Sequence, residues 1–245
     1  MHFIRDYLVH YYEAGPDYRL TIPALVHYFE DIAILHSSSR GLDLEHYESN
    51  HCGWMLIKWD ITVYALPSFG DTVQISTWIH AMKTFMADRE FRMLAQDGSV
   101  LAVARSNWLL MDTVRRRPMR IPEEQIGKFK PMEDSSSFIT IDDVPAFEIE
   151  ETKSVTRVEV RAAHSDIDTN AHVNNVKYIG WAIDSLPADF LAGAQLASLR
   201  VQYRKELTPG ANAQVITTVS GDTSRHRVCG PDTDYCTVEM HWLRT

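Results

Sequence analysis

Hydrophobic residues in the first half of the chain follow two different spacings. One run places side chains three and four residues apart, at Leu25, Phe29, Ile32 and His36. This period predicts an amphipathic helix, with Pro23 in its first turn and Gly41 as its stop. Residues 60–65 then alternate, and strand-like runs follow at 73–77, 85–96 and 100–113, separated by short turns. The first half therefore predicts one long helix and an antiparallel sheet.

The second half repeats this order. A second helix is predicted from about Val173 to Ser185, and its apolar face holds Val173, Val176, Ile179, Ile183 and Leu186. A strand, a Pro-Gly turn and another strand follow over residues 196–221. An offset of 140 positions aligns Ile61 with Val201 and Gly70 with Gly210. The pattern predicts an α+β fold with two similar domains, 1–127 and 153–245, joined by a polar linker at 128–152.

Composition narrows the function classes. The chain has 245 residues, with 24 basic and 33 acidic side chains, and its net charge of −9 argues against a general nucleic-acid binder. Three cysteines, Cys52, Cys229 and Cys236, have no spacing typical of a disulfide framework or a zinc site. The N-terminal residues lack a leader pattern, and no apolar run approaches the ~20 residues that span a bilayer. We therefore expect a cytoplasmic protein with no metal and no cofactor.

The segment DIDTNAHVNN at 166–175 is rich in polar groups. A calcium loop counted from Asp166 needs glycine and glutamate where the chain has Ala171 and Lys177, so that interpretation fails. Helix capping explains any one of the polar residues, at about 1 kcal/mol each, but not the set. Unpaired amides at the start of a helix can also stabilise a carbonyl that gains negative charge, next to Asp168, Asn170 and His172. Only the second half carries these groups and Glu206, which predicts that this half performs the chemistry.

Several strings match one family. The segment N-x-H-V-N-N-V-x-Y-I-G-W at 170–181, YRKEL at 203–207, and GDTVQISTW and SNWLLMDTVRRRPMRIPEE in the first half resemble the acyl-ACP thioesterases of plant plastids and bacteria (ACP, acyl carrier protein). The resemblance implies a tandem double hotdog fold, in which each half is a long helix wrapped by an antiparallel sheet. It also implies a hydrolase of fatty acid biosynthesis, which splits fatty acyl-ACP into free fatty acid and holo-ACP.

The resemblance further implies a catalytic set on a loop and a later strand: Asp168, Asn170, His172 and Glu206. Plant members carry cysteine after the glutamate, where this chain has Leu207, so a thiol mechanism is not available here. In our hypothesis, His172 and Glu206 deprotonate a water. Asp168 is the main base, or a nucleophile that forms a transient anhydride, and Asn170 holds the carbonyl or the aspartate.

The substrate adds two predictions. An apolar slot in the first half is expected to hold the acyl chain, with the candidates Leu25, Phe29, Ile32, Trp54, Leu56, Trp59 and Ile61. A basic cluster is expected to attract the acidic carrier, with the candidates Arg115, Arg116, Arg117, Arg120, Lys128 and Lys130. The alternatives are an acyl-CoA thioesterase of the hotdog class and a non-catalytic acyl-binding module. Both a monomer and a homodimer fit the sequence.

Overall fold

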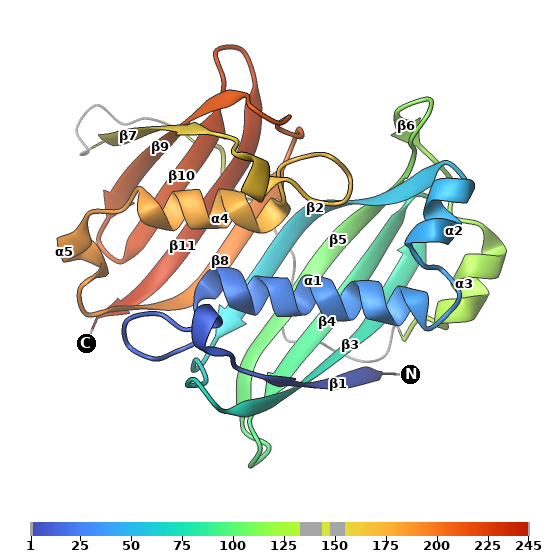
Figure 1. The fold of residues 1–245 in the computed structure, drawn as a ribbon, viewed down its shortest axis with the longest axis horizontal. Coiled ribbons are helices and arrows are strands. Elements are labelled where there is room, and N and C mark those ends of the chain that lie inside the picture. Colours follow the sequence, from blue (N-terminus) through green and yellow to red (C-terminus); the bar gives the residue numbers. More distant parts are fainter. Residues whose placement is uncertain (1, 133–143, 148–154, 245) are drawn as a thin grey trace. The chain divides into compact units, whose positions relative to one another are not determined.

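A computed structural model describes residues 2–132, 144–147 and 155–244 (Figure 1). It divides into two compact units, one made of Met1–Ile57 with Val63–Ile141 and the other of Lys58–Thr62 with Asp142–Thr245. Most of the predicted linker at 128–152 lies outside the described residues, and its first two residues complete a short helix, α3 (Glu123–Phe129). Each unit combines one long helix with antiparallel strands, so the predicted α+β class is confirmed.

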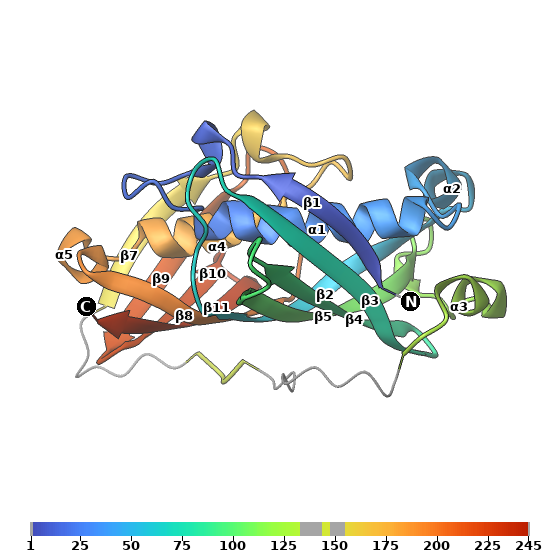
Figure 2. The ribbon, with the colours of Figure 1, turned by 90° about the horizontal axis from the view of Figure 1, so that it is seen from below.

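In the first unit, helix α1 (Ile22–Ser38) lies across one face of its sheet (Figures 1 and 2). Thr21 caps the helix by accepting the N–H of Ala24 at 3.3 Å, and Pro23 stands in the first turn as predicted. The helix ends three residues before Gly41, which adopts a left-handed φ of +69° in the turn that follows. All four residues of the predicted helix face are fully buried: Leu25, Phe29, Ile32 and His36.

The strands of this unit run in the order β1-β3-β4-β5-β2. Their bounds are β1 (Phe3–Leu8), β2 (Cys52–Val63), β3 (Thr72–Lys83), β4 (Met86–Leu94) and β5 (Val100–Asp112), with β6 (Arg117–Pro118) paired to β5. Two short helical segments, η1 (Tyr11–Glu13) and α2 (Leu44–Ser49), flank α1. Successive strands from β3 to β5 are joined by tight turns, which is the meander that the alternating pattern predicted.

The second unit repeats the arrangement. Its strands run in the order β8-β11-β10-β9-β7, with the bounds β7 (Val155–Arg161), β8 (Ala194–Tyr203), β9 (Asn212–Ser220), β10 (Thr223–Cys229) and β11 (Asp234–Arg244). The segment Lys58–Thr62 of β2 pairs antiparallel with β8. Helix α4 (Asn175–Asp184) packs on β9, β10 and β11, and the short segments η2 (His164–Asp166) and α5 (Ala188–Leu191) precede and follow it. The helix begins two residues later than predicted, because Asn174 caps it.

Buried side chains fill both units. In the first, the rings of Phe29 on α1 and Phe91 on β4 lie 5.2 Å apart. In the second, His226 is fully buried, with its Nδ1 2.8 Å from the hydroxyl of Thr217 and its Nε2 2.9 Å from that of Ser224. The three cysteines are free and buried. Among the described residues, no helix is both long enough and apolar enough to cross a membrane.

Candidate active site

Residues 168–172 form a small closed loop before α4. An isolated β-bridge joins Ile167 to Val173, and the N–H of Asp168 donates to the carbonyl of His172 at 2.9 Å. Oδ1 of Asp168 accepts the N–H groups of Asn170 at 2.8 Å and of His172 at 3.4 Å. One carboxylate oxygen of Asp168 therefore organises the backbone of the loop that carries the histidine.

The tip of this loop has an unusual backbone. Ala171 adopts a left-handed φ of +61°, which is unfavourable for a residue with a side chain. Its N–H donates to the carbonyl of Asp168 at 3.1 Å, and both Ala171 and Asn170 are exposed. The turn therefore places the Asn170 side chain at the surface, between the aspartate and the histidine in the sequence.

The loop brings His172 to Glu206. Nε2 of His172 lies 3.2 Å from Oε2 of Glu206, with the two side chains 26% and 39% exposed. Nδ1 of His172 is buried and has no hydrogen-bond partner among the described residues. A carboxylate accepts a proton and cannot donate one when ionised, so the contact favours the tautomer with hydrogen on Nε2 and a lone pair on Nδ1.

Glu206 does not lie on a strand, contrary to the prediction. Strand β8 ends at Tyr203, opposite Cys236 in the ladder with β11. The next two residues, Arg204 and Lys205, donate their N–H groups to the same carbonyl of Tyr235, at 2.8 and 3.3 Å. This shared acceptor ends the regular register, and Glu206 follows in an irregular segment.

Two hydrogen bonds of Leu207 attach the glutamate segment to the histidine loop and to α4. The N–H of Val173 donates to the carbonyl of Leu207 at 3.0 Å, and the N–H of Leu207 donates to the hydroxyl of Tyr178 at 3.0 Å. Tyr178 is 2% exposed, and burial raises the pKa of its hydroxyl. The structure therefore identifies Tyr178 as a positioning residue. The sequence offered one signal for it, the matched tyrosine Tyr28 at an offset of 150.

The start of α4 does not present the row of unpaired amides that was predicted. The N–H of Asn174 donates to the carbonyl of Asp166 at 2.8 Å. The N–H of Val176 donates to Oδ1 of Asn174 at 2.9 Å, and that of Lys177 donates to the Asn174 carbonyl at 3.0 Å. These donors already have acceptors inside the chain, so they cannot also hold a developing oxyanion without rearrangement.

Comparison with known proteins shows which family the chain belongs to. The model of the acyl-ACP thioesterase N-terminal domain matches residues 1–129, and that of the C-terminal domain matches residues 148–243. The chain belongs to the acyl-ACP thioesterase family. It is 31% identical, over 92% of its length, to the chloroplastic palmitoyl-acyl carrier protein thioesterase of Gossypium hirsutum, and the match covers 57% of that protein. The chain thus spans little more than half the length of this curated relative.

Solved structures agree with this assignment. A protein from Lactobacillus plantarum described as an oleoyl thioesterase is 26% identical, with a TM-score of 0.90 over 100% of this chain and 96% of that one. The 12:0-ACP thioesterase from Umbellularia californica is 25% identical, with a TM-score of 0.88 over 100% of this chain and 98% of that one. The predicted double hotdog fold of this acyl-ACP thioesterase family member is confirmed.

The predicted slot residues of this family member are mostly core residues in the structure. Six of the seven are at most 3% exposed: Leu25, Phe29, Ile32, Leu56, Trp59 and Ile61. Trp54 is half-buried, and its indole N–H donates to the hydroxyl of Tyr47 at 2.9 Å. Trp59 and Ile61 lie in the segment of β2 that pairs with β8, so they belong to the second unit. The role of these residues in acyl binding stays a prediction.

The predicted basic residues occupy two neighbouring places along the chain. Arg115 and Arg116 lie in the exposed turn between β5 and β6, and Arg117 begins β6, where it lies opposite Asp112. Nη1 of Arg115 lies 3.3 Å from a carboxylate oxygen of Asp112. The rest of the predicted cluster lies just before or at the end of α3, at Arg120, Lys128 and Lys130. Lys128 is half-buried and lies 3.0 Å from Glu124.

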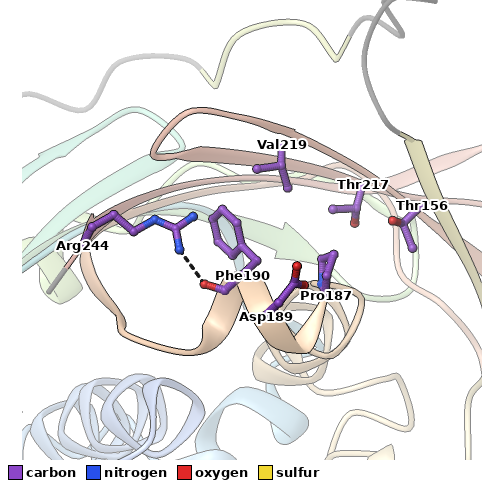
Figure 3. Close-up of a pocket in the computed structure, with 7 residues that line it drawn as sticks. All are labelled: Thr156, Pro187, Asp189, Phe190, Thr217, Val219 and Arg244. Atoms are coloured by element: carbon purple, nitrogen blue, oxygen red, sulfur yellow. Dashed lines mark hydrogen bonds between the residues drawn. The ribbon is translucent and has the colours of Figure 1, made fainter.

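A cavity of about 290 Å³ that the sequence gave no reason to expect lies in the second unit (Figure 3). Its walls come from β7, β9, the α5 region and the end of β11, and the lining residues are Thr156, Pro187, Asp189, Phe190, Thr217, Val219 and Arg244. The guanidinium of Arg244 lies 4.1 Å above the ring of Phe190 and donates to its carbonyl at 2.8 Å. None of these residues belongs to the predicted catalytic set.

Proposed function

We propose that this protein hydrolyses the thioester of fatty acyl-ACP and releases a free fatty acid and holo-ACP. Membership of the acyl-ACP thioesterase family supports the reaction class. The single structural observation that carries the proposal is the 3.2 Å contact between Nε2 of His172 and Oε2 of Glu206, on two segments that are bonded to each other through Val173 and Leu207.

The proposed reaction uses water as the nucleophile. His172 donates its Nε2 hydrogen to Glu206 and so orients the carboxylate, and Glu206, whose side chain is 39% exposed, takes a proton from the attacking water. The water oxygen bonds to the thioester carbon, and the carbonyl becomes an oxyanion that the Asn170 amide stabilises. The C–S bond then breaks, and the proton on Glu206 passes to the departing thiolate of the carrier.

Asp168 has two possible roles in this scheme. One of its oxygens already accepts two loop N–H groups, so its first effect is to hold His172 in place. The other oxygen is the group that would act as a base or attack the thioester carbon. Asp168→Asn separates these roles, because the amide oxygen can still accept both backbone N–H groups while losing basicity and nucleophilicity.

Four substitutions test the proposal. Asp168→Asn, His172→Ala and Glu206→Gln should each lower kcat/KM for acyl-ACP by about 100- to 10,000-fold, which is typical of positioned acid–base groups. His164→Ala is the matched control, since His164 is an exposed histidine in η2 just before the loop. Circular dichroism should show that every variant keeps its fold. Normal hydrolysis by Asp168→Asn removes its chemical role, and normal hydrolysis by His172→Ala removes the mechanism.

We also place the carrier at the basic cluster defined by Arg115, Arg116, Arg117, Arg120, Lys128 and Lys130. Five of the six are exposed, all but Lys128, and their shared sign suits the acidic surface of ACP. Reversing the charges of Arg116 and Arg117 should raise KM for acyl-ACP but leave KM for a small acyl thioester unchanged. The matched control reverses Arg157 and Arg161, two exposed residues of β7. Equal effects on both substrates, or an equal effect of the control, would contradict this docking surface.

The remaining assignments follow from the same interpretation. We place the acyl chain in the first hotdog (1–127), along α1, and the chemistry in the second (153–245). Three free thiols suit the reducing cytoplasm, whereas the curated relative is chloroplastic. Two hotdogs in one chain favour a monomer over a homodimer, and sedimentation velocity distinguishes the two.

A further inference from the structure

A buried arginine in the first unit has an unusual set of partners. Arg89 on β4 is 4% exposed, and its Nη1 lies 2.9 Å from Nδ1 of His36 and 3.3 Å from the hydroxyl of Thr77. Its guanidinium also lies 5.7 Å above the ring of Phe129. In the part of the chain that the structure describes, no carboxylate forms an ion pair with it. Burial lowers its pKa to about 10, so the group stays charged at neutral pH.

The partner histidine carries an unused donor. His36 on α1 is 0% exposed, and burial, followed by the charge of Arg89, lowers its pKa to about 3. The ring is therefore neutral, and because Nδ1 accepts from Arg89, its hydrogen is on Nε2. Nε2 is buried and has no hydrogen-bond partner among the described residues. Buried donors are nearly always satisfied, so this N–H calls for an acceptor that the described residues do not supply.

The pair stands where an apolar surface ends. Phe91 and Arg89 are two residues apart on β4 and so point to the same face of the sheet, toward α1. On the helix, Phe29 contacts Phe91, and His36 contacts Arg89 two turns later, about 10 Å further along the axis. Along the contact between α1 and β4, two packed aromatic rings are thus followed by a guanidinium and an imidazole N–H.

Aromatic rings enclose the pair. The ring of Phe3 stacks on His36 at 5.2 Å, and the ring of Phe129 meets His36 edge-on at 5.2 Å. Water is thereby kept from a charged group and from a donor that has no acceptor among the described residues, an arrangement that costs free energy until an acceptor is supplied.

We propose that His36 and Arg89 form the inner end of the acyl-binding slot and recognise an acyl chain that carries a hydroxyl oxygen at its terminus. This inference rests on the proposed function only for placing an acyl chain along α1. A terminal hydroxyl accepts the Nε2 hydrogen of His36, whereas a terminal methyl group leaves that donor unsatisfied next to a buried charge. The competing explanation is that the pair only anchors α1 to the sheet.

Non-hydrolysable probes separate binding from turnover. We would compare N-methyl amides of fatty acids with the same amides carrying a terminal hydroxyl, over a series of chain lengths, by titration calorimetry on the full chain. At the length that reaches His36, the hydroxylated probe should bind about tenfold more tightly than the plain one. Equal affinities at every length would overturn the proposal.

Variants assign the preference to the pair. His36→Leu and Arg89→Met should abolish it, and His36→Gln should restore it, since glutamine supplies an N–H donor. His27→Leu is the control, because His27 lies on the same helix with its side chain exposed. A preference that survives in His36→Leu would overturn the proposal.

A spectroscopic measurement on the wild-type protein tests the inference even if a variant fails to fold. In wild-type protein labelled with ¹⁵N at histidine, the Nε2 hydrogen of His36 should move downfield with the hydroxylated probe and not with the plain probe. An unmoved signal under saturating hydroxylated probe overturns the inference. Selective binding without hydrolysis of any acyl-ACP would instead contradict the proposed function and leave this inference standing.

Discussion

Acidification should destabilise both units, because each buries a neutral imidazole. His36 lies in the first unit and His226 in the second, and burial lowers the pKa of each ring to about 3. In the unfolded chain a histidine titrates near its model value of 6.5. Below that pH the imidazole binds a proton in the unfolded state but stays neutral in the folded state. The stabilisation is therefore complete above pH 6.5 and is lost progressively as the pH falls toward 3.

The magnitude follows from the two pKa values. Linkage gives about 1.4 kcal/mol per pH unit for each histidine between these limits, or about 2.5 kcal/mol per histidine between about pH 7 and about pH 4.5. Domains of ordinary stability unfold with about 5–15 kcal/mol. One such histidine in each unit is thus enough to remove a large part of that unit's stability in mild acid.

Urea unfolding over this pH range, followed by tryptophan fluorescence, tests the argument. His226→Gln keeps groups that can bond to Thr217 and Ser224 but does not titrate, so its stability should depend less on pH than that of the wild type. The difference in free energy of unfolding between the wild type and His226→Gln should be about 2.5 kcal/mol less favourable to the wild type at about pH 4.5 than at about pH 7. Carboxylates shared by both proteins cancel in this difference. A constant advantage across the range would refute the reasoning.

Substitutions at three further positions probe the site and the core. Tyr178→Phe removes the acceptor of the buried Leu207 N–H, so urea titration should show a loss of about 1–3 kcal/mol and steady-state assays a lower kcat. Ala171→Val puts a branched side chain at a φ of +61°, which should lower kcat through the loop with little change in the urea midpoint, whereas Ala171→Gly should leave kcat unchanged. Phe29→Ala should cost about 3–5 kcal/mol by calorimetry, since its ring is 0% exposed. A shift below 1 kcal/mol for Phe29→Ala would contradict its place in the core.

The sequence predicted those helices and strands whose position is set by residues close together in the chain. The period of Leu25, Phe29 and Ile32 located α1, because burial of one helix face imposes that spacing. The start of α4 was missed by two residues, since capping by Asn174 decides it and several neighbouring residues have capping side chains. Glu206 was placed on a strand because its neighbours continue a strand-like run. The end of β8 depends on Tyr235, which is more than thirty residues away in sequence.

The sequence predicted which residues form the candidate site, but not which of their side chains contact each other. Motif strings identified His172 and Glu206, and no pattern in them shows that the imidazole and the carboxylate touch. The pairing of His36 with Arg89 joins positions 53 residues apart and was invisible in the sequence. In the helix pattern His36 counted only as part of a buried face. That its Nε2 has no hydrogen-bond partner among the described residues is visible only in three dimensions.

The burial of all three sulfhydryls has a practical consequence for inhibition studies. Leu207, not cysteine, follows Glu206, and Cys52, Cys229 and Cys236 are 3%, 4% and 0% exposed. An alkylating reagent can therefore react with the native protein only when a unit opens, at a rate set by breathing of the fold and not by thiolate reactivity at the catalytic centre. The rate at which iodoacetamide alkylates Cys52 would thus report how often the first unit opens. The alkylation rates of Cys229 and Cys236 would report the same for the second unit.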